Sequence, residues 1–298
     1  MDLCFAINRT VSPFRDLDGF LALARQAGVQ GVEIRNDVEG REFADGTPAS
    51  ELKARVADAG LAIASINALQ RFNDWNAERA AEARAVIEYA GACGAPGLVL
   101  CPVVDAADGR GPAQLEKDLR RALLELKPML GANGVVGLVE PLGMVESTLK
   151  FKAPSVEAIA EIDGFADFAL CHDTFQHFRC GDTALFPEYT GIVHVSGIVE
   201  RTLPREALKE PHRGFVDGDD ISGNVEQVAV FLDRGYAGFI SFEPFDPAVQ
   251  RLDDPCAALA ASMAYLRSAL ASARPDGSAS PRTGAHARSQ SGPALGER

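Results

Sequence analysis

The sequence predicts an α/β protein built as a single (β/α)8 barrel, in which eight parallel strands are each followed by a helix or loop. Eight short apolar runs alternate with helical or loop segments along residues 3–270. The fifth to eighth runs also end in an acid or carry a histidine near the end. Eight alternating units of this length favour a closed barrel over an open, doubly wound sheet.

The predicted strands are short apolar runs bounded by turn residues, as expected for parallel strands buried on both faces. The fifth run is the clearest of them. It reads VGLVEPLG, and four largely apolar residues lead into Glu140 before Pro141 and Gly143 end it. The eight predicted strands are 3–8, 31–37, 61–69 (ending near Asn67), 97–102, 136–143, 168–173, 192–197 and 238–244.

The predicted helices show apolar residues at helical spacing, and several end at a glycine such as Gly28 or Gly94. Pro255 suits the first turn of the last helix, whereas Pro128 predicts that the fourth helix ends close to it. The segment 174–189 contains no convincing long helix. The predicted helices are 16–28, 50–59, 77–93, 114–130, 155–162, 225–234 and 255–270.

Two regions follow from this pattern. Residues 1–272 form the predicted TIM-barrel catalytic domain. Residues 273–298 are rich in Ser, Gly, Ala, Pro and Arg and lack apolar periodicity. Such a composition cannot bury enough apolar surface to fold, so a disordered C-terminal tail is predicted.

Composition narrows the classes of function. A formal net charge of -13 disfavours nucleic acid as a partner. No apolar run approaches the roughly 18 residues that span a bilayer, and the N-terminus has Asp2 where a signal peptide is basic. The 6 cysteines lack zinc-motif or disulfide spacing, which indicates buried thiols and a reducing cytoplasm. No strand is followed by a nucleotide-binding glycine motif.

The ends of the last four strands suggest a metal site. Active sites of barrels lie where the C-terminal strand ends converge, and Glu140, Asp173, His194 and Glu243 occupy neighbouring ends. Each residue alone is more often a capping, salt-bridged or core group than a ligand. Together, three carboxylates and one imidazole suit one divalent ion, namely Mn²⁺, Mg²⁺, Co²⁺ or Zn²⁺.

Residues 1 to about 270 resemble a known superfamily through several motifs in order. The motifs are CFAIN, VEIRND, SINALQRFNDW, LVLCP, LVEPLG, HDTF, VHVSG, HR followed by VD, and SFEPF. The chain is similar to the sugar isomerase/epimerase superfamily with the xylose-isomerase-like barrel, and within it most to the inosose (2-keto-myo-inositol) isomerases. The resemblance implies a divalent ion held by Glu140, Asp173, His194 and Glu243.

The resemblance also implies a reaction. The metal polarises the carbonyl of a bound ketose or keto-polyol and lowers the cost of an enediolate. One glutamate removes the proton beside the carbonyl and the other returns a proton to the next carbon, which assigns catalysis to Glu140 and Glu243. The sequence leaves open which glutamate acts as base.

The substrate-binding residues are less well defined. Relatives place a histidine three residues after the strand-six aspartate, where this chain has Gln176 followed by His177. Either Gln176 acts as a neutral hydrogen-bond partner or the loop shifts to present His177. Glu146 and Arg213 are further candidates, each equally consistent with a solvated surface residue. The weaker candidates are Asn67, Arg35 and Trp75.

The predicted function is a carbonyl shift on a cyclic keto-polyol by a metal-dependent isomerase. A ketose 3-epimerase, or an eliminase or hydratase of 3-keto sugars, would use the same site. An abasic-site endonuclease of the same superfamily needs several zinc ions and more histidines than the 5 present. A non-catalytic sugar-binding barrel is disfavoured because inward acids are costly without an ion. Neither a membrane nor nucleic acid is an expected partner, and a homo-oligomer is compatible with the sequence.

Overall fold

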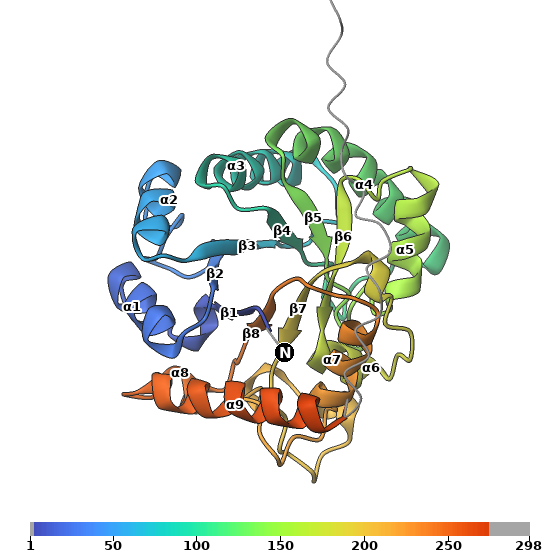
Figure 1. Ribbon diagram of the computed structural model, residues 1–298. Coiled ribbons are helices and arrows are strands. Elements are labelled where there is room, and N and C mark those ends of the chain that lie inside the picture. The colour runs from blue at the N-terminus through green and yellow to red at the C-terminus, as the bar shows by residue number, and fades with distance from the viewer. Residues whose placement is uncertain (1–2, 274–298) are drawn as a thin grey trace, which may run out of the picture.

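The fold is a closed barrel of eight parallel strands surrounded by helices, as predicted. The computed structural model describes residues 3–273. The strands pair in chain order from β1 to β8, and β8 pairs with β1 to close the ring (Figure 1). The strands are β1 Phe5–Asn8, β2 Gly31–Arg35, β3 Ala62–Leu69, β4 Gly97–Leu100, β5 Val136–Val139, β6 Phe168–Asp173, β7 Thr190–Val195 and β8 Ile240–Phe242.

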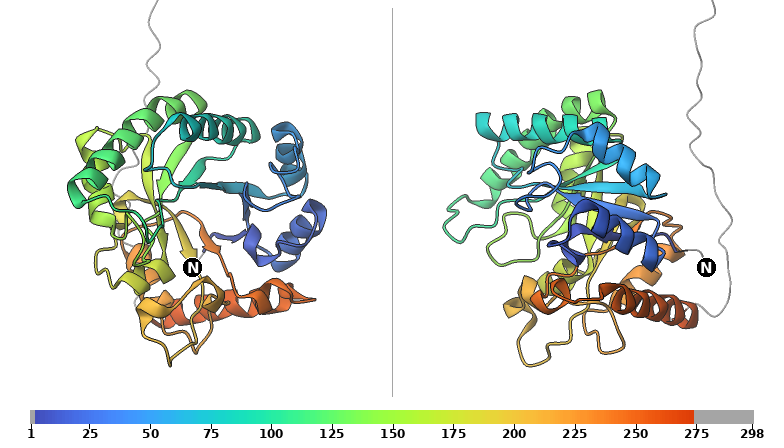
Figure 2. Two further views of the ribbon diagram at one scale, coloured as in Figure 1. Left: turned by 180° about the vertical axis from the view of Figure 1, so that it is seen from behind. Right: turned by 90° about the vertical axis from the view of Figure 1, so that its left-hand side faces the viewer.

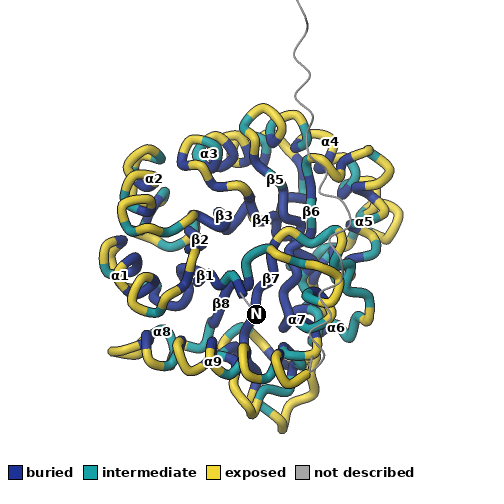
Figure 3. Tube along the Cα trace, in the orientation of Figure 1, coloured by how far each residue is buried: buried dark blue, intermediate teal, exposed yellow. Residues whose placement is uncertain are grey.

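The helices form an outer ring that covers the strands from all sides (Figure 2). They are α1 Leu17–Ala27, α2 Ala49–Asp58, α3 Ala77–Cys93, α4 Pro112–Asn133, α5 Lys152–Glu161, α6 Thr174–Cys180, α7 Asn224–Asp233, α8 Pro247–Gln250 and α9 Pro255–Ala273. Figure 3 shows the consequence for burial: the strands are buried, and the helices are exposed on their outer sides. The predicted tail, 273–298, lies outside the described residues apart from Ala273, the last residue of α9.

Several predicted boundaries are wrong by a few residues. Helix α4 continues past Pro128 to Asn133 and ends at Gly134, which adopts a left-handed conformation. The proline removes the hydrogen bond to the carbonyl of Leu124, and Leu124 lies on the solvent side of the helix, where it is 52% exposed. Helix α5 begins at Lys152 rather than Ser155, because Pro154 is tolerated in a first turn. Strand β3, in contrast, ends at Leu69 like the predicted run 61–69, two residues beyond Asn67.

The core has two layers. A large apolar cluster fills the space between strands and helices. A smaller cluster lies inside the barrel and consists mostly of small residues, namely Ala6, Ala64, Ala68, Val99, Cys101, Leu138, Cys171 and Ile192. Because strand residues alternate between the two faces, the residue two places after an inward member also points inward. This rule directs the polar side chains described below to the same end of the barrel.

Among the described residues, α9 alone is long and apolar enough to cross a membrane by length and composition. Its Leu259, Met263, Leu266 and Leu270 are buried, and α9 contacts α1 and α7. These contacts identify α9 as part of the outer ring of the barrel. The sequence analysis did not single out this helix, because it looked for an uninterrupted apolar run and Arg267 interrupts this one.

Candidate metal centre

The four predicted ligands meet at the C-terminal end of the barrel. Leu138, Cys171 and Ile192 belong to the inner cluster. Glu140, Asp173 and His194 each come two residues after one of them, so strand alternation points these three side chains inward as well. Glu243 follows β8. One donor atom from each of the four lies within 4.8 Å of the others, and all four residues are buried. The sequence therefore brings four ligating groups together from four consecutive strands.

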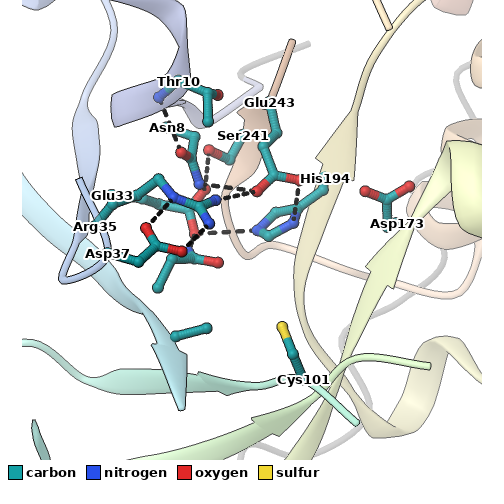
Figure 4. Close-up of polar contacts among 12 residues, drawn as sticks. Asn8, Thr10, Glu33, Arg35, Asp37, Cys101, Asp173, His194, Ser241 and Glu243 are labelled. Atoms are coloured by element: carbon teal, nitrogen blue, oxygen red, sulfur yellow. Dashed lines mark hydrogen bonds and ion pairs between the residues drawn. The ribbon is translucent and has the colours of Figure 1, made fainter. Parts of the chain in front are cut away.

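His194 is the centre of this group. Its Nδ1 atom lies 3.3 Å from Glu140 Oε1 and 3.2 Å from Glu243 Oε2. Figure 4 shows the imidazole between Glu243 and Glu33, with Asp173 on the neighbouring strand. Two carboxylates from β5 and β8 thus point at the same nitrogen atom.

Glu33 on β2 is a site residue that the sequence analysis missed. It is fully buried, and its Oε2 accepts a hydrogen bond from His194 Nε2 at 3.0 Å. Further donors are Ser65 Oγ at 2.5 Å, Asn67 Nδ2 at 2.8 Å and Ser241 Oγ. Because the carboxylate accepts from Nε2, it leaves Nδ1 to face the ligand group. The available signal was an acid inside the otherwise apolar run GVEI.

The protonation of the four ligand residues reflects how closely their acidic side chains are packed. Burial lowers the pKa of His194, but Cys171, Glu33 and Glu243 outweigh it, so the net shift is a rise well above 6.5. Burial raises the pKa of Asp173 to about 7, although the guanidinium of Arg213 opposes this rise. Without an ion, a proton on the imidazole balances part of the negative charge. A divalent cation would balance more of it.

Arg213, on the loop after β7, lies against two of the four ligands. Its Nη2 donates to Asp173 Oδ2 and, at 2.9 Å, to Glu243 Oε2. Its Nη1 donates to Glu210 Oε2 at 2.6 Å, and Nε donates to Ser196 Oγ at 3.0 Å. The Arg213 side chain is only 3% exposed. Arg213 is thus a fixed cation beside the acids rather than a solvated surface residue.

Gln176 continues this network. Its Nε2 donates to Glu210 Oε1 and its Oε1 accepts from the backbone N–H of Gly143, both at 2.9 Å. Glycine is required at position 143, because a Cβ there would lie 2.1 Å from the Gln176 carbonyl oxygen. The loop after β5 and helix α6 therefore pack closely at the edge of the site.

A cavity of about 150 Å³ opens above the ligands. Of the predicted substrate-binding residues, Asn67, Gln176, Arg213 and Arg35 line it. Its other lining residues are Gln70, Cys101, Glu140, Leu142, Met144, Glu210, Glu243 and Phe245. The structure thus assembles hydrogen-bonding side chains around the entrance to the site.

Three predicted residues lie elsewhere. His177 faces away from the cavity, with its Nδ1 2.9 Å from Lys152 Nζ. Burial and the nearby Lys152 lower the pKa of His177 to about 4. Glu146 is exposed on the loop after β5, and Trp75 is buried in the apolar core. The structure places Gln176, and not His177, at the cavity.

The four residues fit a divalent ion by their chemistry. Three carboxylates and the Nδ1 of one imidazole form a mixed oxygen and nitrogen donor set typical of Mg²⁺, Mn²⁺, Co²⁺ and Zn²⁺ sites. Like-charged carboxylates buried within 4.8 Å are costly unless a cation lies between them. The hydrogen bond from His194 to Glu33 is the outer support that ligating histidines usually have.

Comparison with known families agrees with this geometry. The description of the family model that matches residues 21–269 is "Xylose isomerase-like TIM barrel". The chain belongs to this family. No curated protein matches the sequence.

Solved structures support the fold. A xylose isomerase domain containing protein from Salmonella typhimurium LT2 is 27% identical, with a TM-score of 0.79 over 91% of this chain and 99% of that one. The IolI protein, solved with a zinc atom, is 18% identical, with the same TM-score and the same coverage. An L-ribulose 3-epimerase is 21% identical, with a TM-score of 0.71 over 92% of this chain and 96% of that one.

Proposed function

We propose that this family member is a divalent-metal-dependent isomerase that shifts a carbonyl between adjacent carbons of a cyclic keto-polyol such as 2-keto-myo-inositol. The observation that carries the proposal is the approach of Glu140 and Glu243 to the Nδ1 atom of one histidine. The two glutamates follow strands separated by β6 and β7 in the ring. They therefore reach the ligand group from different parts of the ring.

The proposed ion is held by Glu140, Asp173, His194 and Glu243. When bound, it supplies positive charge that polarises a substrate carbonyl. Binding of an ion at Nδ1 requires that nitrogen to lose its proton, so metal affinity should rise with pH. The IolI protein was solved with zinc, which supports the expectation of a transition-metal or similar ion in this chain.

The chain's own residues perform the proton transfers. One of Glu140 and Glu243 takes the proton from the carbon beside the carbonyl, and the other returns a proton to the neighbouring carbon. Proton transfer by a positioned carboxylate contributes about 10²–10⁴-fold in rate. Donors such as Asn67 and Gln176 at the cavity wall would hold the remaining hydroxyl groups.

The charge of the site supports a neutral substrate. Three ligand carboxylates and a divalent ion together carry about one negative charge. Arg213 and Arg35 do not offer free cations for a phosphate, because both already pair with Glu243. A neutral polyol that bonds through hydroxyl groups fits these surroundings better than a sugar phosphate.

The test is proton NMR in D₂O with candidate ketoses and the protein loaded with Mg²⁺, which does not broaden the spectrum. The proposal expects 2-keto-myo-inositol to gain deuterium and to convert to a product with its carbonyl on the next carbon. The Asp173→Asn variant is the control for metal dependence. Deuterium exchange at one carbon with inversion, on a linear ketose, would instead establish a 3-epimerase, as similarity to an L-ribulose 3-epimerase suggests. No exchange with any ketose would reject both reactions.

A further inference from the structure

A second group of ligating atoms lies at the same centre. Glu140, Cys171 and His194 form a buried set whose donor atoms lie within 4.8 Å of one another. Cys171 is a free thiol with no exposed surface. It points inward from β6 two residues before Asp173. Glu140 and His194 therefore belong to two alternative sets, one completed by Asp173 and Glu243 and the other by Cys171.

The two distances from His194 Nδ1 in the second set suit a tetrahedral ion. Cys171 Sγ lies 3.5 Å from His194 Nδ1, and Glu140 Oε1 lies 3.3 Å from the same nitrogen. Bonds of about 2.0–2.3 Å at tetrahedral angles separate ligand atoms by about 3.3–3.6 Å. His194 Nδ1 thus lies at a typical ligand–ligand separation from both other donors, and all three donor atoms lie within 4.8 Å of one another.

The two sets differ in the ion pairs that their members already form. Asp173 and Glu243 form buried ion pairs with Arg213. Among the described ion pairs, Glu140 contacts only His194. An ion that uses Asp173 and Glu243 must compete with the guanidinium, whereas an ion that uses Cys171 leaves those pairs intact.

We propose that a soft divalent ion such as Cd²⁺ is held by Glu140, Cys171 and His194, while a harder ion such as Mn²⁺ or Mg²⁺ is held by the four-residue set. Thiolates prefer soft ions and carboxylates prefer hard ones. Binding exchanges the S–H bond for a metal–sulfur bond and releases one proton. The inference rests on the proposed metal centre, since the sets share two ligands.

Cd²⁺ is the probe, because a cadmium–thiolate bond gives a charge-transfer band in the ultraviolet. The wild-type protein should show one such band per chain, and the Cys171→Ser variant should lose it. Cys101→Ser is the matched control, because Cys101 is also buried and its Sγ lies 3.4 Å from Glu140 Oε2, yet it belongs to neither set. The control should keep the band.

Calorimetry separates the two sets. Cys171→Ser should weaken Cd²⁺ binding at least about tenfold. Even mutation of a residue that only hydrogen-bonds a metal ligand lowers metal affinity by about 10–100-fold. It should change Mn²⁺ affinity less than about threefold, while Asp173→Asn should weaken Mn²⁺ binding much more than Cd²⁺ binding. Circular dichroism melting checks that each variant folds, and Cys171→Ala replaces Cys171→Ser if the latter does not.

The outcomes distinguish the inference from the proposed function. The second set is rejected if the wild-type protein shows no Cd²⁺ band, or if the band survives in the Cys171 variants. If Mn²⁺ still binds in either case, the proposed function stands. Equal sensitivity of both ions to Asp173→Asn would also overturn the inference. If neither ion binds the wild-type protein, the metal centre itself is wrong and both proposals fail.

Discussion

The substitution Glu33→Gln tests whether the carboxylate behind His194 prepares it for metal binding. Glu33 accepts hydrogen bonds from His194, Ser65, Asn67 and Ser241, and a longer one from Asn8. All five partners donate, so only an acceptor-rich group fits between them. A glutamine has nearly the same shape but places an N–H₂ group where at least one donor already points. Replacing the carboxylate therefore creates a donor facing a donor inside the barrel.

The expected losses of metal affinity and of folding stability follow from these contacts. Rotation of the amide to face His194 would favour the tautomer that keeps the proton on Nδ1, the atom that faces Glu140 and Glu243. Loss of such a support typically lowers metal affinity by about 10–100-fold, or about 1.4–2.7 kcal/mol. An unsatisfied buried donor costs a further ~1–3 kcal/mol in the free energy of unfolding.

The assay combines calorimetric titration with Mn²⁺ and nitrogen NMR of the His194 ring in the metal-free protein. Ser241→Ala is the matched control, because it removes one donor from Glu33 and leaves the contact to His194. It should weaken Mn²⁺ binding less than about threefold. If Glu33→Gln binds Mn²⁺ as tightly as the wild type and keeps its proton on Nε2, the carboxylate does not position the ligand.

Four further predictions address the ligands, the proton carriers, the tail and a partly buried histidine. Asp173→Asn should lose most Mn²⁺ affinity yet keep its fold, because the remaining oxygen can still cap α6; calorimetry and melting check this, and full activity after chelation would contradict the metal requirement. Glu140→Gln and Glu243→Gln, each fully loaded with metal, should lose about 10²–10⁴-fold in isomerisation, with deuterium exchange failing in the variant that lacks the base; near wild-type turnover in both would refute the two-glutamate reaction. Deletion of residues 273–298 should leave turnover and melting temperature nearly unchanged, and a large drop in melting temperature would show that this segment docks. The folded pKa of His177 is about 4 and its ordinary value is 6.5, so only the unfolded chain gains this proton between those pH values and stability falls as pH falls. His177→Gln should reduce this fall in folding stability by about 1–2 kcal/mol, after allowance for the partial exposure of the ring. If the pH dependence of urea unfolding is unchanged in the variant, the low pKa of His177 is wrong.

The barrel was predictable because each strand is a short apolar run with a turn at its end. The same pattern placed Glu140, Asp173 and His194 at strand ends, where a closed ring brings them together. The end of α4 was predicted wrongly, since the tolerance of Pro128 depends on the exposure of its helix surface. A one-dimensional pattern does not contain that exposure.

Glu33 was not found because its role depends on distance across the barrel. It lies 161 residues before His194 in the chain, and no local spacing joins them. The pairing of Arg213 with Asp173 likewise depends on how the loop after β7 folds back over the site. His177 was a candidate because of its position beside Gln176, but the helical turn directs it toward Lys152 instead. Strand ends are predictable from sequence, whereas loop side chains need the folded structure.

The position of Asp173 has a consequence for how this chain can vary in evolution. One of its oxygens caps α6 by accepting from the backbone N–H of Gln176 at 2.8 Å, and the other faces Arg213 and the ligand group. A glutamate would preserve the charge, but its longer side chain is a poor helix cap. An asparagine would preserve the cap but not the charge. Two independent demands therefore meet in one side chain, so this position should tolerate fewer replacements than Glu140 or Glu243, neither of which caps a helix.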